Sequence, residues 1–401
     1  MRILAFLGAG SMVEIGGPTA SQITKIICRK RQEVWDRSTK SVKKFWFLRT
    51  ITKLLDNYYA PEGANFEDVF HVLEMLDSFR TSWSPGTVKE YKSGVTAFVT
   101  PRGKKFFDQG VLLTAKEDLI AAVTDEVNRY TEDFLAKRPT WFISFWQRAF
   151  ASALWDIATL NYDPCMEQGI GVALEDGFVD TGRGFYRFDP RQIRSSKMNR
   201  ILHLHGSILY GYIRTSNLYA YDDDHEDLYR YDNFQDAKAT WFGRSTNTAQ
   251  SREQAIAGPI ITGLRKTDKA LCYPYNTYYS LFQDSIIENP RLLIAGYSFG
   301  DFHFNKMLER VAALHDKNRR VVLITRFEDP TSWHPDQHVM NWPSQEMYMF
   351  VAKVFRDQYP FKSYIFTSPL ISADGCVHLY LQGFQDALVN HGQQIIDFLT
   401  K

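Results

Sequence analysis

Cysteine is scarce, and the few cysteines are not arranged as a covalent or metal framework. The four of them stand far apart in a chain of 401 residues, at Cys28, Cys165, Cys272 and Cys376. Zinc modules and redox pairs bring two cysteines within a few positions of each other, and no C-x-x-C pair occurs here. The sequence therefore excludes a disulfide framework and a four-thiolate zinc site, and it fits the reducing cytosol.

Long apolar runs and an excess of charge are also missing. The N-terminal stretch RILAFLG (2–8) is too short for the core of a secretion signal, and no window approaches the ~18 apolar residues of a membrane span. The 47 basic residues nearly balance the 46 acidic ones, for a net charge of +1. We therefore expect a cytoplasmic protein that contacts neither a membrane nor, directly, nucleic acid.

Although the total charge is balanced, two short segments carry charge of mainly one sign. The basic run CRKRQ (28–32), continued by Lys40, Lys43 and Lys44, is interpreted as the solvated face of a helix. The acidic run DDDHED (222–227) contains groups that suit a hard divalent cation, but it lacks the spacing of a calcium loop. We interpret it as a solvated loop and predict no metal site.

The chain opens with the pattern of a nucleotide-binding unit. The apolar run at 2–8 ends in glycine, as a buried parallel strand does, and leads into GAGS. Thr19 and Gln22 then form a T-x-x-Q capping box that predicts the start of a helix. Strand, glycine turn and helix follow one another directly.

Residues 40–150 change character. Their apolar residues recur at helical spacing, and Asn65 is a good N-cap for one of the helices. Only SGVTAFVTP (93–101) has the alternation of a strand. The region is predicted to be a helical insertion.

Strand signals return after the insertion and complete the predicted fold. Short apolar runs occupy 154–163, 199–207, 290–301 and 319–327, with one further strand at 376–383 and a closing helix at 393–401. The residues at 219–233 read as a loop. We predict an α/β fold, with a Rossmann-like parallel sheet, helices on both faces and a helical insertion subdomain. The predicted divisions are a Rossmann-like core (1–39 and 151–330), the insertion (40–150), and a mixed C-terminal segment (331–401) that packs on the core or at an oligomer or partner interface.

Polar residues or glycines follow four of the predicted strands. In open parallel sheets, ligands bind outside the carboxyl ends of the strands, so four such ends indicate one site. They are Gly8-Ala9-Gly10-Ser11, Asn161-Tyr162-Asp163, His205-Gly206-Ser207 and Gly296-Tyr297-Ser298.

Each motif is weaker alone than the set. The dehydrogenase fingerprint G-x-G-x-x-G fails because position 13 is valine, which disfavours a hydride-transferring enzyme. His203 is interpreted as a structural histidine deeper in its strand. His205 differs, because Gly206 and Ser207 end the strand and open space beside it.

Together these segments resemble the sirtuin family. GAGSMVEIGGP resembles the sirtuin phosphate loop, TLNYD its T-Q-N-I-D segment and LHGS its L-H-G segment, while GYSFGD resembles a G-Y-S-x-x-D variant of bacterial sirtuin-like defence proteins. The four segments occur in the same order as in sirtuins. They cover some forty residues, although the implied fold would span most of the chain.

The departures from the family are informative. Deacetylating sirtuins carry a four-cysteine zinc module soon after the histidine, whereas here the next cysteine is Cys272. Their D-F-R segment is replaced by Thr19, Ala20 and Ser21. The chain is therefore more similar to the sirtuin-like NADases of bacterial anti-phage systems, which cleave NAD⁺ to nicotinamide and ADP-ribose, sometimes as a cyclised product. NAD is then the substrate, and no zinc is expected.

The resemblance assigns roles to the motif residues. Asn161 and His205 are the catalytic pair: the carboxamide holds a ribose hydroxyl and the attacking water, and the imidazole takes the proton. Gly8, Gly10 and Ser11 anchor the diphosphate, Asp163 supports the nicotinamide amide or its loop, and Ser298 and Asp301 line the adenosine side. The full set predicted to bind NAD is Gly8, Ala9, Gly10, Ser11, Thr159, Asp163, Gly206, Gly296, Ser298 and Asp301.

Two other classes stay open: a protein deacylase or ADP-ribosyltransferase, and a non-catalytic sensor of NAD⁺ or ADP-ribose. A toxic NADase needs restraint, so we expect a homo-oligomer and a separate regulatory partner. On the resemblance, that partner is a HerA-type hexameric ATPase, with a short Argonaute as the alternative.

Overall fold

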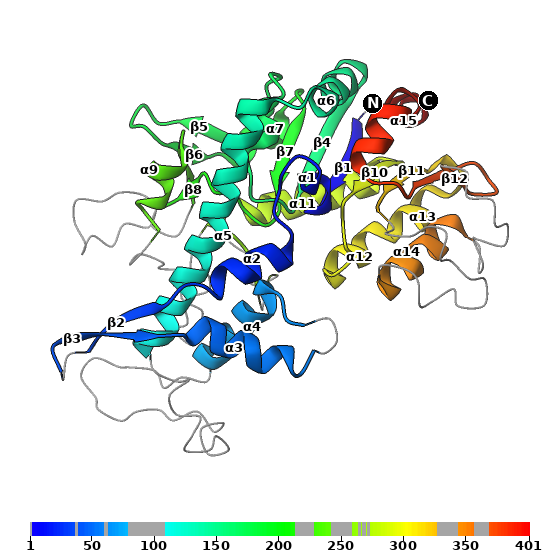
Figure 1. Cartoon of the computed structure of the whole chain (residues 1–401). Coiled ribbons are helices and arrows are strands. Elements are labelled where there is room, and N and C mark those ends of the chain that lie inside the picture. The colour runs from blue at the N-terminus through cyan, green and yellow to red at the C-terminus, as the bar shows by residue number, and fades with distance from the viewer. Residues whose placement is uncertain are drawn as a thin grey trace.

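The computed structural model describes residues 2–36, 39–59, 63–78, 109–212, 228–241, 259–263, 266, 270, 273–326, 344–356 and 369–401. Its centre is a seven-stranded sheet in the order β12-β13-β11-β10-β1-β4-β7 (Figure 1). The strands are β1 (Arg2–Leu7), β4 (Leu154–Thr159), β7 (Arg200–His203), β10 (Arg291–Ala295), β11 (Arg320–Ile324), β12 (Leu370–Ile371) and β13 (Val377–Tyr380).

Both faces of this sheet are buried, which explains why its strands are continuous apolar runs. Along β1, Ile3 and Ala5 join one hydrophobic cluster and Leu4 and Phe6 the other. The first cluster includes α6 (Thr140–Ser152) and α15 (Phe384–Thr400). The second includes α11 (Tyr275–Glu288), α12 (Phe302–Leu308), α13 (Arg310–His315) and α14 (Gln345–Phe355). The predicted α/β fold with helices on both faces is confirmed.

The strand order defines where a ligand would enter. Six strands are parallel, and β12 pairs antiparallel at one edge. Numbered as they follow in the chain, the parallel strands lie in the order 3-2-1-4-5-6, so the direction of winding reverses between β1 and β10. In doubly wound sheets the ligand crevice opens at this switch point. The expected strand at 376–383 is present as β13, and the closing helix, α15, begins earlier than predicted.

Most of the segment between β1 and β4, without α6, forms a second lobe. It contains α1 (Gly10–Val13), α2 (Ala20–Ile27), a hairpin of β2 (Gln32–Asp36) and β3 (Ser41–Phe45), α3 (Phe47–Asp56), α4 (Phe66–Ser78) and α5 (Gln109–Lys137). Figure 1 shows the hairpin, α3 and α4 gathered around one end of the long helix α5. The capping box of Thr19 and Gln22 is present, and Asn65 caps α4. The boundaries drawn for the subdomains stay a prediction, and 93–101 lies outside the described residues.

The interpretation of the basic run as a helix face is wrong. Lys43 and Lys44 lie on β3, whose residues are all exposed, opposite Val34 and Glu33 of β2. The reason is Gln32, which is fully buried and whose Oε1 accepts the N–H groups of Phe47 and Leu48 at the start of α3, at 2.9 and 3.1 Å. This contact joins Gln32 to the start of α3, so the residues between them form a hairpin instead of continuing the helix.

A small four-stranded sheet flanks β7. It consists of β5 (Phe178–Asp180), β6 (Tyr186–Phe188), β8 (Tyr210–Gly211) and β9 (Tyr229–Arg230), accompanied by α7 (Cys165–Gly169), α8 (Pro190–Ser195) and α9 (Phe234–Lys238). Part of the predicted loop at 219–233 is therefore strand β9. Its Arg230 is held by Asp176 at 2.9 Å and by the ring of Tyr186. The acidic run at 222–227 lies outside the described residues. None of the helices that the structure describes is long and apolar enough to span a membrane.

The turns after β1 and β10 are in direct backbone contact. The N–H of Gly8 donates to the carbonyl of Ala295 at 2.9 Å, and the N–H of Gly10 donates to that of Gly296 at 2.8 Å. A Cβ atom on Gly296 would lie 1.8 Å from the backbone nitrogen of Ser11, and the φ of Gly296 is +64°. Only glycine fits at this position.

We therefore predict that Gly296→Ala lowers the free energy of unfolding by more than about 3 kcal/mol, because a steric clash adds to a left-handed backbone. Chemical denaturation at neutral pH measures the change. Gly375→Ala is the matched control: its φ is +68°, and nothing lies within 4 Å of its added Cβ. That variant should lose only about 1–2 kcal/mol. Equal losses in the two variants would contradict the clash.

Candidate active site

The strand register explains why the sequence motifs meet. Parallel pairing lines up the last residues of four strands, Leu7, Thr159, His203 and Ala295. Asn161 and His205 each follow two residues after their strand ends, so they leave the same edge at equivalent positions. The glycine turn leaves that edge beside them. The two side chains singled out from the sequence are therefore placed together by backbone pairing.

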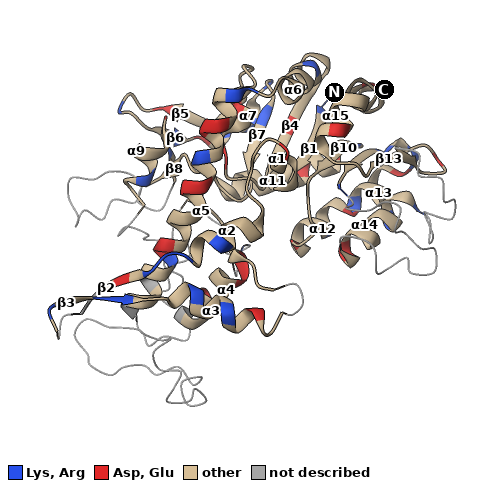
Figure 2. Ribbon diagram, in the orientation of Figure 1, with Lys and Arg blue, Asp and Glu red and all other residues tan. Residues whose placement is uncertain are grey.

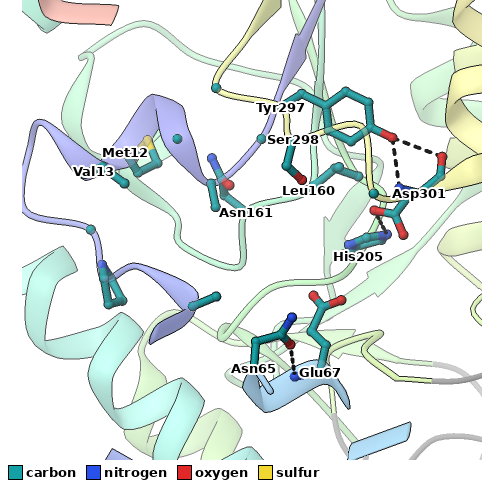
Figure 3. A pocket seen from close by; sticks show the side chains of 18 of the residues that line it. Met12, Val13, Asn65, Glu67, Leu160, Asn161, His205, Tyr297, Ser298 and Asp301 are labelled. Atoms are coloured by element: carbon teal, nitrogen blue, oxygen red, sulfur yellow. Dashed lines mark hydrogen bonds and ion pairs between the residues drawn. The ribbon is translucent and has the colours of Figure 1, made fainter. Parts of the chain in front are cut away.

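A cavity of about 890 Å³ opens at this edge, within the size range of small-molecule and cofactor sites. The glycine turn, the loops after β4, β7, β10 and β11, the first turns of α2 and α4, and the start of α15 form its wall. Figure 3 shows Asn161 and His205 on the wall that also carries Ser298 and Asp301. The predicted site residues that line the cavity are Gly8, Ala9, Gly10, Asn161, His205, Gly296, Ser298 and Asp301.

Four other predicted residues lie behind the wall, and two of them orient Asn161. The amide nitrogen Nδ2 of Asn161 donates to Ser11 Oγ at 3.3 Å, and Ser11 Oγ donates to the carbonyl of Gly8 at 2.7 Å. The backbone N–H of Asn161 donates to Thr159 Oγ1 at 3.0 Å. Ser11 and Thr159 thus fix the carboxamide relative to the glycine turn.

Asp163 and Gly206 hold the adjoining loops. Asp163 accepts from the hydroxyl of Tyr130 and, at 3.1 Å, from the N–H of Cys165. Burial raises the pKa of Asp163, although these hydrogen bonds lower it. Gly206 has a φ of +94°, and a Cβ there would lie 2.1 Å from the carbonyl oxygen of Pro259. Asp163 thus contacts α5 and its own loop, and its predicted role toward NAD stays a prediction.

His203 lies outside the cavity lining, as a structural histidine would. Its Nε2 is 2.5 Å from Oε1 of Glu167 on α7, and its Nδ1 is 3.4 Å from the backbone oxygen of Asn161. The ring is buried. The two histidines of LHLH thus have different surroundings although they are only two positions apart.

A charged cluster that the sequence did not reveal surrounds His205. The Nε2 atom of His205 is 3.9 Å from Oδ2 of Asp301, and Oδ1 of Asp301 accepts from Lys266 Nζ at 2.7 Å. Lys266 also reaches Glu67 on α4 at 3.1 Å. The side chains of Lys266 and Asp301 are only 13% and 16% exposed. Asp301 thus lies beside the imidazole, and its expected place on the adenosine side stays a prediction.

The charges in the cluster shift one another. Burial alone would raise the pKa of Asp301, but His205 and Lys266 lower it below its usual value. Burial would likewise lower the pKa of Lys266, but Glu67 and Asp301 raise it. Burial lowers the pKa of His303, which lies in the first turn of α12, directly after the N-cap residue Asp301 and Phe302. Asp301 is therefore held as a carboxylate and Lys266 as an ammonium.

Some of these residues had a local signal in the sequence. Asn65, recognised as an N-cap, places Glu67 in the first turn of α4, where it lines the cavity. His303 lies two residues after the GYSFGD segment. Lys266 had no such signal, because a long-range contact brings its segment to the site. The backbone N–H of Ile261, five residues earlier, donates to the carbonyl of His205 in the loop after β7.

No group of three or more histidine, cysteine, aspartate or glutamate side chains within the described ranges is arranged to hold a metal ion. That the chain uses no metal and no zinc stays a prediction.

Comparison with known proteins agrees with this geometry. A family model described as a SIR2-like domain matches residues 156–342, a stretch that contains Asn161, His205, Ser298 and Asp301. The match supports a sirtuin-like domain and, with it, the binding or use of NAD. It begins within β4, so it does not include the glycine turn or the second lobe. No curated protein matches the chain.

We predict that Lys266→Met lowers the free energy of unfolding by about 3 kcal/mol at pH 7, because it leaves the buried Asp301 carboxylate without its ammonium. The pKa of Asp301 should rise in this variant. Wild-type Asp301, with its lowered pKa, contributes stability above its unfolded pKa of about 3.9 and loses it as pH falls further. The variant protonates Asp301 at higher pH, so the gap between the two proteins should narrow from pH 7 to pH 4.

Denaturant unfolding at both pH values measures this gap. Lys306→Met is the control, because Lys306 pairs with Glu309 on the surface at 3.4 Å and is half exposed. That variant should change stability by less than about 0.5 kcal/mol. A gap for Lys266→Met that is the same at pH 4 and pH 7 would show that Asp301 is not the affected partner.

Proposed function

We propose that this protein is an NAD⁺ glycohydrolase that cleaves the bond between nicotinamide and ribose to give nicotinamide and ADP-ribose. One observation carries the proposal: Asn161 and His205 line a single cavity together with the glycine turn of Gly8 and Gly10. A diphosphate needs backbone N–H groups that can approach closely, and glycine permits that approach. The ribose needs a group that holds it and a group that takes a proton.

The departure of nicotinamide needs little acid catalysis. Nicotinamide is bound to ribose as a cationic pyridinium, so it leaves as a neutral molecule while positive charge develops on the anomeric carbon. The C–N bond breaks, and an oxygen of water bonds to that carbon. The proton of the water must be accepted by the protein or by solvent.

Asn161 and His205 suit the two remaining tasks. Because Nδ2 of Asn161 is held by Ser11, the carbonyl oxygen of the carboxamide is the end that can accept from a ribose hydroxyl or from water. His205 can take the proton of the attacking water as a general base. The carboxylate of Asp301, 3.9 Å from Nε2 of His205, stabilises the imidazolium that results. The imidazolium then releases its proton to solvent.

We predict that His205→Ala and Asn161→Ala each lower the rate of nicotinamide release at least about 100-fold, with the fold intact. Chromatography of nicotinamide released from NAD⁺ measures the rate, and thermal unfolding reports the fold. Asn390→Ala and His391→Ala on α15, which lie outside the cavity lining, remove the same two side-chain types and should keep the wild-type rate. A folded His205→Ala or Asn161→Ala protein with an undiminished rate would remove that residue from the mechanism.

The same assay separates the proposed reaction from its alternatives. A glycohydrolase releases nicotinamide at the same rate with or without an acetylated peptide, and the peptide stays acetylated. Release that depends on the peptide would instead identify a protein deacylase. Binding of NAD⁺ without release of nicotinamide would identify a sensor.

We further propose that NAD⁺ depletion by this chain serves anti-phage defence, in a homo-oligomer restrained by a separate partner, preferably a HerA-type ATPase and otherwise a short Argonaute. The support is the resemblance of GYSFGD and of the other strand-end segments to sirtuin-like defence proteins. Coexpression with the product of the neighbouring gene, followed by size-exclusion chromatography, should yield a joint complex. A monomer that is fully active alone would contradict restraint by a partner.

A further inference from the structure

A second cavity of about 640 Å³ lies on the opposite side of α2 from the first. Ala20 and Ile23 face the first cavity, whereas Lys25 and Arg29 face the second. The remaining wall comes from α3 and from the turn that precedes α4. Asn65, in that turn, lines both cavities.

The second cavity is positively charged. Its lining contains three cations, Lys25, Arg29 and Arg49, and one carboxylate, Asp56, so its net charge is +2 (3 − 1). Asp56 accepts the backbone N–H of Ala64 at 2.9 Å. Within the part of the chain that the structure describes, none of the three cations pairs with a carboxylate. Figure 2 shows basic residues on α2 and α3 in this part of the second lobe.

One of the three cations also contacts an aromatic ring of the lining, and two hydroxyl groups of the lining are already hydrogen-bonded. The guanidinium of Arg49 lies over the ring of Trp46 at 5.5 Å, and that of Arg31 lies over it at 4.5 Å, so the aromatic ring restricts both side chains. Thr24 and Thr52 donate their hydroxyl hydrogens to backbone carbonyls at 2.7 and 2.9 Å. The cavity therefore offers charged donors, which suit an anion, whereas these two hydroxyl hydrogens are already used.

We propose that this second cavity binds a small phosphorylated ligand and that its binding is coupled to the first cavity. A phosphomonoester carries a charge of about −1.5 to −2 at pH 7, which matches the +2 of the lining. Guanidinium groups bind phosphate oxygens with a fixed, bidentate geometry. Arg29, from the basic run that the proposed reaction leaves unexplained, thus gains a role.

The coupling follows from shared elements. Oδ1 of Asn65 accepts the N–H groups of Glu67 and Asp68 at 2.8 and 3.2 Å and so fixes the start of α4. Glu67 then pairs with Lys266 in the charged cluster beside His205. A ligand held between α2 and α3 therefore orders the helix starts that line the first cavity. The coupling rests on the proposed function, whereas the binding itself does not.

Calorimetric titration of the full chain with inorganic pyrophosphate, at low ionic strength, tests the binding. We expect saturable binding that weakens at least about ten-fold in the variant Arg29→Gln/Arg49→Gln, a loss of about 1.4 kcal/mol. The control Lys43→Gln/Lys44→Gln removes the same charge from the exposed strand β3 and should change the affinity less than about two-fold. Equal weakening in both variants, binding that survives in the arginine variant, or no saturable binding would overturn the site.

Nicotinamide release tests the coupling. Pyrophosphate should change the KM for NAD⁺ by about 5-fold or more in the wild-type chain, and the Arg29→Gln/Arg49→Gln variant should lose this effect. An effect that persists in the variant would place pyrophosphate in the first cavity and contradict the coupling, as would an unchanged KM. A chain that binds pyrophosphate as expected but releases no nicotinamide would refute the glycohydrolase and leave the second site standing.

Discussion

The backbone contact between the turns after β1 and β10 is the constraint on which the site depends. Gly10 donates to Gly296 at 2.8 Å, and neither turn has room for a side chain at the crossing. This contact lies at the switch point of the sheet, where the helices that follow β1 and β10 diverge to opposite faces and leave a crevice. Ser11, fixed in the same turn, then holds the carboxamide of Asn161. Backbone packing thus orients a side chain that comes from 150 residues away in the chain.

The parts of this arrangement that depend on local chemistry could be predicted from the sequence. The apolar runs gave the parallel strands, and the capping residues Thr19 and Asn65 gave two helix starts. The meeting of Asn161 and His205 could be predicted as well, because the carboxyl ends of parallel strands share one edge of a sheet. The structure adds the strand register: Thr159 pairs with His203, and Asn161 and His205 each come two residues after these paired residues.

The parts that depend on long-range contacts could not be predicted. Gln32 gives no helix or hairpin signal of its own, yet its bond to the N–H groups of Phe47 and Leu48 decides that the basic segment turns back as a hairpin. Lys266 has no motif around it and reaches Glu67 from 199 residues away. The GYSFGD motif identified Asp301 but not its partner Lys266, because a motif gives the position of a carboxylate in the sequence and says nothing about which residues contact it.

The charged cluster also bears on the direction of the proposed chemistry. With His205 neutral, Asp301 and Glu67 contribute two negative charges and Lys266 one positive charge, so the cluster carries −1 (−2 + 1) beside the imidazole. Loss of nicotinamide moves positive charge from the pyridinium to the ribose, and fixed negative charge nearer the ribose than the pyridinium stabilises such a transition state more than the ground state. When His205 then takes the proton of water, the cluster becomes neutral. Lys266 therefore reduces the negative charge beside the imidazole: without it, the mostly buried Asp301 and the partly exposed Glu67 would together contribute −2 there.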